Sequence, residues 1–177
     1  MKRLTPLLTG IAAAALIAGC GGSSYSSSSK STPGASTPAP VNAYGTPAKA
    51  PATPAGATAV VSTKHDKLGT VLAGRKGLTL YLFEADKGTA SACSGACAQA
   101  WPPLTTQGTP TVANGAVAAD LGTIKRSDGT TQVTYKGHPL YYFVQDKDSG
   151  DAYGQGSKAF GADWYVVAPS GKKIDAS

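Results

Sequence analysis

The pattern of apolar and polar positions divides this chain into three segments. Residues 7–17 are nearly all apolar, residues 20–57 hold almost no large apolar side chain, and residues 58–177 alternate short apolar runs with turn residues. Runs rich in Val, Leu, Tyr and Thr that end at turn residues are typical of strands. They predict strands at residues 69–73, 78–84, 122–125, 131–135, 140–145 and 164–168.

Turn signals between these runs decide the fold class. Asp128-Gly129 between two predicted strands is a strong hairpin signal. A short helical turn is predicted near Cys97 and Trp101, and the prolines that follow should stop it. We therefore predict an all-β fold, with one small antiparallel domain over residues 58–177.

One sequence unit occurs twice in this domain. Residues 80–86, Leu-Tyr-Leu-Phe-Glu-Ala-Asp, match residues 140–146, Leu-Tyr-Tyr-Phe-Val-Gln-Asp, and each half then reaches a tryptophan. Residues 68–71 and 121–124 also match, as Leu-Gly-Thr-Val and Leu-Gly-Thr-Ile. The spacings differ by several residues, so we predict a domain built from two diverged repeats.

The repeated strand is apolar on both faces. Side chains alternate across a strand, so Leu80 and Leu82 should share one face while Tyr81 and Phe83 share the other. This predicts a central strand whose aromatic side chains lie in the core, the alternative being a ligand platform of stacked tyrosines. The aspartate that follows each copy is expected to accept backbone hydrogen bonds and set a turn.

The N-terminal segment has the three parts of an export signal. Lys2 and Arg3 precede the apolar run, which is too short to span a bilayer, and small residues follow it. The run closes with Ile-Ala-Gly-Cys at Cys20, which resembles the bacterial lipobox. We therefore predict a lipoprotein signal peptide over residues 1–19 and a lipid on Cys20, which would hold the chain on the extracytoplasmic face of the cell membrane. The alternative is ordinary secretion.

A Ser, Thr, Pro and Ala composition marks residues 20–57 as a tether. Such a segment cannot bury enough apolar surface to offset its ordering entropy, so we predict disorder. As a flexible coil it would span about 30–35 Å. That length suits a spacer between a membrane and a folded domain.

Charge and motif content narrow the function classes. The net charge is +6 with no dense Lys/Arg cluster, which gives nucleic-acid binding little support. No Gly-x-Ser-x-Gly motif or phosphate-binding glycine loop is present, and Glu84 is the only glutamate. The sequence therefore favours a non-enzymatic protein, and we expect a monomer.

Cys93 and Cys97 form the sharpest constellation of chemistry-bearing residues. In an exported protein an isolated cysteine pair is more often a disulfide than a pair of free thiols. The alternative is a redox pair or a copper site, because thiolates suit Cu(I) and His138 or His65 could supply a third ligand. Otherwise we predict no cofactor.

Several motifs together resemble a known family. They are Leu80-Tyr81-x-Phe83-x-x-Asp86, Cys93-x-x-x-Cys97-Ala98-x-x-Trp101-Pro102-Pro103-Leu104, Arg126-x-Asp128-Gly129, Gln132-Val133-Thr134-Tyr135-x-Gly137-x-Pro139-Leu140-Tyr141-x-Phe143 and Gly150-Asp151-x-x-Gly154-Gln155-Gly156. This set resembles the secreted-repeat lipoproteins, which are marked by a Tyr-x-aromatic-x-x-Asp motif. The resemblance implies an envelope lipoprotein with paired repeats and does not supply a mechanism.

These observations lead to two functional hypotheses. The first is a membrane-anchored binding or structural module whose partner is another component of the cell envelope. The second is envelope redox or copper handling through Cys93 and Cys97, with His138 as a further ligand.

Overall fold

The computed structural model describes residues 57–175. The predicted signal peptide, the lipid on Cys20 and, apart from Ala57, the predicted tether therefore lie outside the described residues. Within the described part of the chain no helix is long and apolar enough to cross a membrane.

The described residues form three small sheets with one short helix, as the all-β prediction required. The sheets have the strand orders β2-β1-β4, β3-β9-β8 and β5-β6-β7. The elements are β1 (Val60–Asp66), β2 (Gly69–Ala73), β3 (Tyr81–Phe83), α1 (Ala96–Ala100), β4 (Thr111–Val112), β5 (Leu121–Lys125), β6 (Thr131–Tyr135), β7 (His138–Pro139), β8 (Ser157–Ala159) and β9 (Ala162–Val166), with 3-10 turns at Arg75–Gly77 and Ala118–Asp120.

Each repeat begins with an antiparallel hairpin. β1 pairs with β2, and β5 pairs with β6. Asp128 and Gly129 form the turn of the second hairpin, as predicted, with Gly129 at a φ of 80° and its N–H donating to the carbonyl of Arg126. A positive φ is accessible to glycine without strain, which explains its place in this turn.

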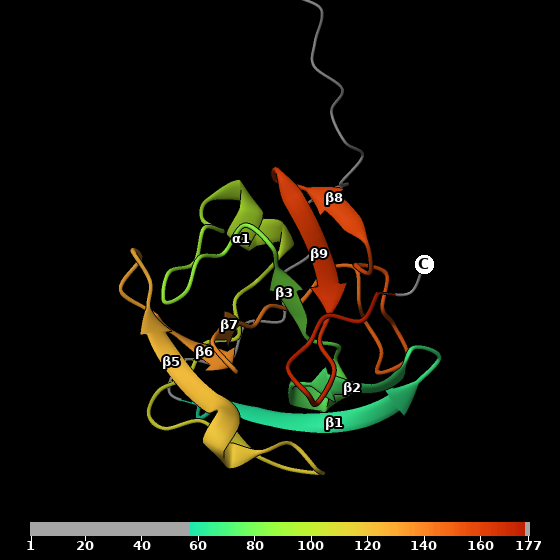
Figure 1. The fold of residues 1–177 in the computed structure, drawn as a ribbon. Helices are drawn as coiled ribbons and strands as arrows, with labels where there is room; N and C mark the ends of the chain where they lie inside the picture. The colour runs from blue at the N-terminus through green and yellow to red at the C-terminus, as the bar shows by residue number, and fades with distance from the viewer. Residues whose placement is uncertain (1–56, 176–177) are drawn as a thin grey trace, which may run out of the picture. The chain divides into compact units, whose positions relative to one another are not determined.

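The two repeats meet at β3, which lies in the middle of the fold beside β9 (Figure 1). On its other side Tyr81 pairs with Tyr141, the equivalent residue of the second repeat. The N–H of each donates to the carbonyl of the other, at 2.9 and 3.0 Å. The motif tyrosines of the two repeats are therefore joined directly by a pair of backbone hydrogen bonds.

The two faces of the repeated strand enter two separate cores, which confirms the alternation predicted from the sequence. Leu80 and Leu82 lie in one apolar cluster, and Tyr81 and Phe83 lie in the other. The side chains of the second repeat are divided in the same way: Leu140 and Tyr142 lie in the first cluster, and Tyr141 and Phe143 lie in the second. All of these side chains are buried.

The predicted strand at 140–145 is wrong. Only Tyr141 makes bridges there, to Tyr81 and to Pro103, and the chain turns from Val144 onward. The neighbouring segment is Pro102-Pro103, and prolines have no N–H to donate, so a regular ladder cannot continue. The short strand β7 lies just before this segment.

Four strands lie outside all the predicted strand ranges: β1, β4, β7 and β8. β1 has only one buried residue, Val61, and its residues 62–66 are all polar, so it lacks the apolar alternation that marks a strand. Two further strand predictions have shifted ends: the strand predicted at 78–84 is β3, and that at 164–168 is β9.

The match between residues 68–71 and 121–124 does not reflect structural equivalence. Leu72 and Val133 are the true counterparts, because the carbonyl of each accepts the N–H of the leucine before the motif tyrosine, at 3.1 and 3.0 Å. Their own N–H groups donate to Val167 and Leu104, which each follow a tryptophan by three residues. β2 therefore corresponds to β6, and β1 to β5.

Candidate functional site

The tyrosine of each repeat is hydrogen-bonded to the aspartate of the other repeat. The Tyr81 hydroxyl donates to Oδ2 of Asp146 at 2.6 Å, and the Tyr141 hydroxyl donates to Oδ2 of Asp86 at 2.8 Å. We call these two bonds the Tyr–Asp exchange. Because each motif is completed by the other copy, neither repeat carries its own set of partners.

The two aspartates also make matching backbone contacts. Oδ1 of Asp86 accepts the N–H of Ala92 at 2.7 Å, and Oδ1 of Asp146 accepts the N–H of Tyr153 at 3.0 Å. The prediction that both aspartates accept backbone hydrogen bonds is therefore confirmed, but the donors lie 6 and 7 residues further along the chain, so each carboxylate closes a loop and not a tight turn. What the sequence did not indicate is the tyrosine partner of each carboxylate.

Burial raises the pKa of both tyrosine hydroxyls, and the negative charge of the partner aspartate raises it further. Burial also raises the pKa of Asp86 and Asp146, although hydrogen bonds from the chain and from the tyrosines act in the opposite direction. The tyrosines are therefore held as neutral donors. They are positioned as hydrogen-bonding elements of the core.

The raised pKa of Asp146 predicts a pH dependence of stability. A carboxyl whose pKa is higher in the folded than in the unfolded chain stabilises the fold fully below the unfolded value, about 3.9, and this contribution is lost as pH rises through the folded pKa. We expect the difference in unfolding free energy between the wild type and Asp146→Asn to shrink as pH rises through that window. Urea denaturation at a series of pH values measures it, and a difference that grows with pH would contradict the assignment.

The tryptophan of each repeat also packs against the phenylalanine of the other repeat. Trp101 stacks on Phe143 with ring centroids 4.2 Å apart, and Trp164 stacks on Phe83 at 4.1 Å. The two tryptophans stack on each other at 3.9 Å. The aromatic core is therefore a single stack with contributions from both repeats.

The motif tyrosines contact the edges of this stack. Tyr81 meets Trp101 edge to face at 5.3 Å, and Tyr141 meets Trp164 at 5.2 Å. Gly154 lies against the same cluster, where an added Cβ would be only 2.6 Å from Trp101. The aromatic residues are core residues, as the sequence favoured, and the alternative of an exposed platform of stacked tyrosines is wrong.

Cys93 and Cys97 form a disulfide, with Cα atoms 5.2 Å apart. Both residues are buried, with exposed fractions of 1% and 6%. The bond closes the loop that leads into α1, which is the structural interpretation that the sequence favoured.

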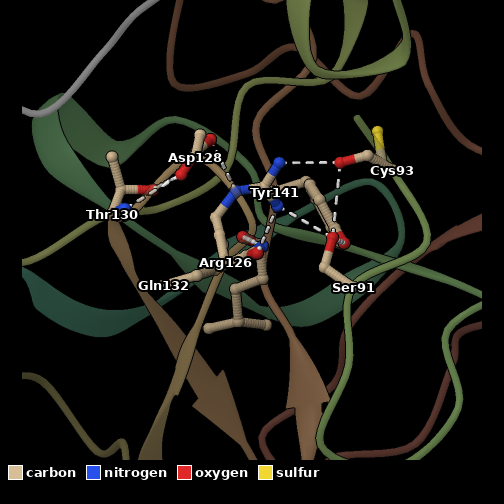
Figure 2. Close-up of polar contacts among 8 residues, drawn as sticks. Ser91, Cys93, Arg126, Asp128, Thr130, Gln132 and Tyr141 are labelled. Atoms are coloured by element: carbon tan, nitrogen blue, oxygen red, sulfur yellow. Dashed lines mark hydrogen bonds and ion pairs between the residues drawn. The ribbon is translucent and has the colours of Figure 1, made fainter. Parts of the chain in front are cut away.

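Arg126 holds this disulfide loop against the second repeat (Figure 2). Its guanidinium donates to the Cys93 carbonyl at 2.7 Å, to Ser91 Oγ at 2.8 Å and to Gln132 Oε1 at 2.7 Å. Its Nε pairs with Asp128 at 3.2 Å, but Asp128 has an exposed side chain. The sequence contained Arg126 and Gln132 within the family motifs, yet gave no indication of this role.

Gln132 and Ser91 connect the arginine to the Tyr–Asp exchange. Gln132 Nε2 donates to the Leu140 carbonyl at 2.9 Å, directly before Tyr141. Ser91 Oγ lies 2.7 Å from the Tyr141 hydroxyl. The disulfide loop of the first repeat is therefore joined to the motif of the second through a continuous hydrogen-bond network that is buried at Arg126 and Gln132 and partly buried at Ser91.

Removing the disulfide should cost stability without abolishing the fold. Closing a loop with a sequence separation of 4 is worth about 2 kcal/mol in the chain-entropy model. We expect the double variant Cys93→Ser/Cys97→Ser to lose about that much unfolding free energy in urea denaturation and to unfold in one transition, because Arg126 still holds the loop. Loss of cooperative unfolding would contradict this expectation.

The residues of the copper hypothesis do not form a metal cluster. In residues 57–175 no group of three or more His, Cys, Asp and Glu side chains is arranged to hold a metal ion. The copper hypothesis thus concerns only the reduced protein, because sulfurs in a disulfide are not thiolate ligands. His138 lies in β7, and His65 lies within β1.

A groove of about 650 Å³ opens beside β3 and the turn that follows it. Leu82 forms part of its wall, and six charged or titratable residues line the rest: Glu84, Asp86, His138, Lys172, Lys173 and Asp175. The groove thus brings together the turn of the first repeat, the β7 hairpin of the second and the C-terminal segment. It is the candidate binding site.

The two aspartates of the exchange differ in their access to this groove. Asp146 is buried, with an exposed fraction of 3%, whereas Asp86 is only half-buried and lines the groove. Equivalent positions of the two repeats have therefore diverged. One carboxylate is enclosed within the fold and the other is open to a ligand.

The fold and the site define a class of protein: an all-β module of two repeats, completed by residues that each repeat supplies to the other. A family described as a secreted repeat of unknown function matches the chain twice, at residues 62–105 and 122–168. The chain belongs to this family, and the two matches coincide with the two structural repeats. Membership of a secreted family places the repeats outside the cytoplasm. No curated protein and no solved structure matches the chain.

Proposed function

We propose that this protein is a non-enzymatic binding or structural module of the cell envelope, held on the extracytoplasmic face of the membrane by a lipid on Cys20. The tether over residues 20–57 lets the domain reach an envelope component beyond the membrane surface. The module acts as a monomer and does not bind nucleic acid.

One observation carries this proposal. The residues of the shared motif are in the core: Tyr81, Tyr141, both tryptophans and Asp146 are buried. Their hydrogen bonds are made to one another and to the backbone, so the motif builds the fold. We therefore expect binding to occur at the surface, where charged side chains line the groove beside β3.

The anchor is tested by the Cys20→Ala variant. Acyl chains anchor a protein because each methylene group buried in the bilayer contributes about 0.8 kcal/mol. Without the lipid, the proposed membrane anchor is lost. We expect the wild type to be found in the membrane fraction with a mass that includes the lipid. The variant should lack the added lipid mass and should be released from the membrane. Wild-type protein without added lipid mass would overturn the anchor.

The binding role is tested with isolated cell walls. The cell walls should retain the full chain in an amount that saturates as more protein is added. A retained amount that stays proportional to the added protein would count against a specific site. Washing at raised ionic strength provides the control for weak attraction between a basic protein and an anionic surface. Retention that is not saturable at any ionic strength would leave no support for a built binding site.

A further inference from the structure

The groove beside β3 contains a carboxylate without a directly paired cation. Asp86 is half-buried, and no described Lys, Arg or His nitrogen lies within 4.0 Å of its carboxylate oxygens. A carboxylate removed from water is stabilised by an opposite charge nearby. The protein supplies hydrogen bonds to Asp86 and a longer-range attraction from Arg126 and His138, but leaves the position of a directly paired cation open.

Asp86 retains the capacity to bind a further donor. A carboxylate has about four lone-pair sites, and the Tyr141 hydroxyl and the Ala92 N–H occupy two of them. These two bonds also fix the orientation of the carboxylate. A donor that arrives from the groove therefore meets an acceptor that is already positioned.

The other charges of the groove show which positions remain for a ligand. Glu84 is neutralised by Lys173 at 2.6 Å, and Lys173 is held over the Tyr165 ring at 4.3 Å. Lys172 lines the same groove, is exposed, and forms none of the ion pairs among the described residues. Asp175 is exposed and likewise forms none of these ion pairs. The groove thus offers an anchored acceptor at Asp86, a cation at Lys172 and a second, exposed carboxylate at Asp175.

We propose that this groove binds a peptide fragment that carries a primary ammonium group and a carboxylate, with the ammonium at Asp86 and the carboxylate at Lys172. A groove of about 650 Å³ is within the size range of small-ligand sites. This rests on the proposed function, and it specifies the ligand chemistry of that same module.

The counterpart at Asp146 shows why only one such site is expected. Its carboxylate accepts the same two kinds of bond, from Tyr81 and from the N–H of Tyr153, but it is 3% exposed. A ligand cannot reach it without opening the fold. The two repeats should therefore bind one ligand per chain.

The test is a titration of the full chain with Nα-acetyl-lysine, which has one ammonium and one carboxylate, followed by NMR of the His138 ring. The His138→Gln variant assigns the signal. For so small a probe we expect saturable binding with a Kd on the order of 1 mM. Nα,Nε-diacetyl-lysine, without the ammonium, and Nα-acetyl-lysine amide, without the carboxylate, should each bind about two- to fivefold more weakly.

Matched variants separate the groove from the rest of the surface. Asp86→Asn should weaken binding of Nα-acetyl-lysine, and Lys172→Glu should do so without touching the core, because Lys172 is exposed. Asp148→Asn removes an exposed charge outside the groove and should bind as the wild type does. Equal binding by the diacetylated probe, or by Lys172→Glu, would overturn the proposal.

Comparison with the cell-wall experiment keeps the two claims apart. If cell walls retain Lys172→Glu as well as they retain the wild type, the groove assignment fails and the binding module stands. If Nα-acetyl-lysine binds with the expected dependence on Lys172 while cell walls retain nothing, the groove assignment stands and the wall-binding role fails.

Discussion

Replacing Trp164 with alanine should cost about 3–5 kcal/mol of unfolding free energy, as expected for the loss of a large, fully buried aromatic side chain. Trp164 is fully buried, stacks on Trp101 at 3.9 Å and on Phe83 at 4.1 Å, and donates Nε1 to the Ala159 carbonyl at 3.0 Å. Its removal leaves a cavity between rings from both repeats. Such a cavity cannot close without moving the strands that carry the rings.

An exposed aromatic residue close in sequence provides the control. Phe160 lies between β8 and β9 and is 46% exposed, so Phe160→Ala should change stability by no more than about 0.5 kcal/mol. Both variants are measured by urea denaturation. If Trp164→Ala loses less than about 1 kcal/mol, the stack does not hold the repeats together.

Replacing Arg126 with methionine should cost about 3–5 kcal/mol, because buried acceptors are left without donors. The Arg126 side chain is 3% exposed, and it donates to Gln132 Oε1 and to the Cys93 carbonyl, both at 2.7 Å. Methionine fills part of the volume and donates no hydrogen bond. The loss of unfolding free energy therefore comes mainly from the broken hydrogen bonds of Arg126 and only in small part from lost packing.

The adjacent residue gives a matched control for Arg126. Lys125→Met removes an exposed cation at the last residue of β5, directly before Arg126. The only described side-chain hydrogen bond of Lys125 is to Thr131 at 2.8 Å, so this variant should change stability by no more than about 0.5 kcal/mol. Arg126→Lys should also be destabilising, because one ammonium cannot reproduce the planar fork of the guanidinium. A lysine variant as stable as the wild type would show that the network geometry is unimportant.

The sequence predicted the parts of the fold that depend on local pattern. The alternation from Leu80 to Phe83 assigned both faces of the central strand correctly, and Asp128-Gly129 located a hairpin turn. β1 was missed because most of its residues are polar and only Val61 is fully buried. Its pairing with β2 and β4 determines its structure more than its own pattern does.

The candidate site was less predictable, because its contacts join distant parts of the chain. The motif showed that Tyr81 and Asp86 recur together, which suggests a contact within one repeat. The structure instead pairs Tyr81 with Asp146, 65 residues away. Spacing in a sequence cannot distinguish these arrangements, since both place a tyrosine and an aspartate at the same interval. The groove likewise depends on the C-terminal segment, which the repeat does not include.

The central claim is that the two repeats form one cooperative unit through the Tyr–Asp exchange and the shared aromatic stack. Native-state hydrogen exchange tests it most directly, at the hydrogen-bonded amides of Leu72 and Leu80 in the first repeat and of Val133 and Leu140 in the second. The account predicts one opening free energy for all four amides, equal to the free energy of global unfolding. Two separate values, one for each repeat, would show that the repeats open independently and would contradict it.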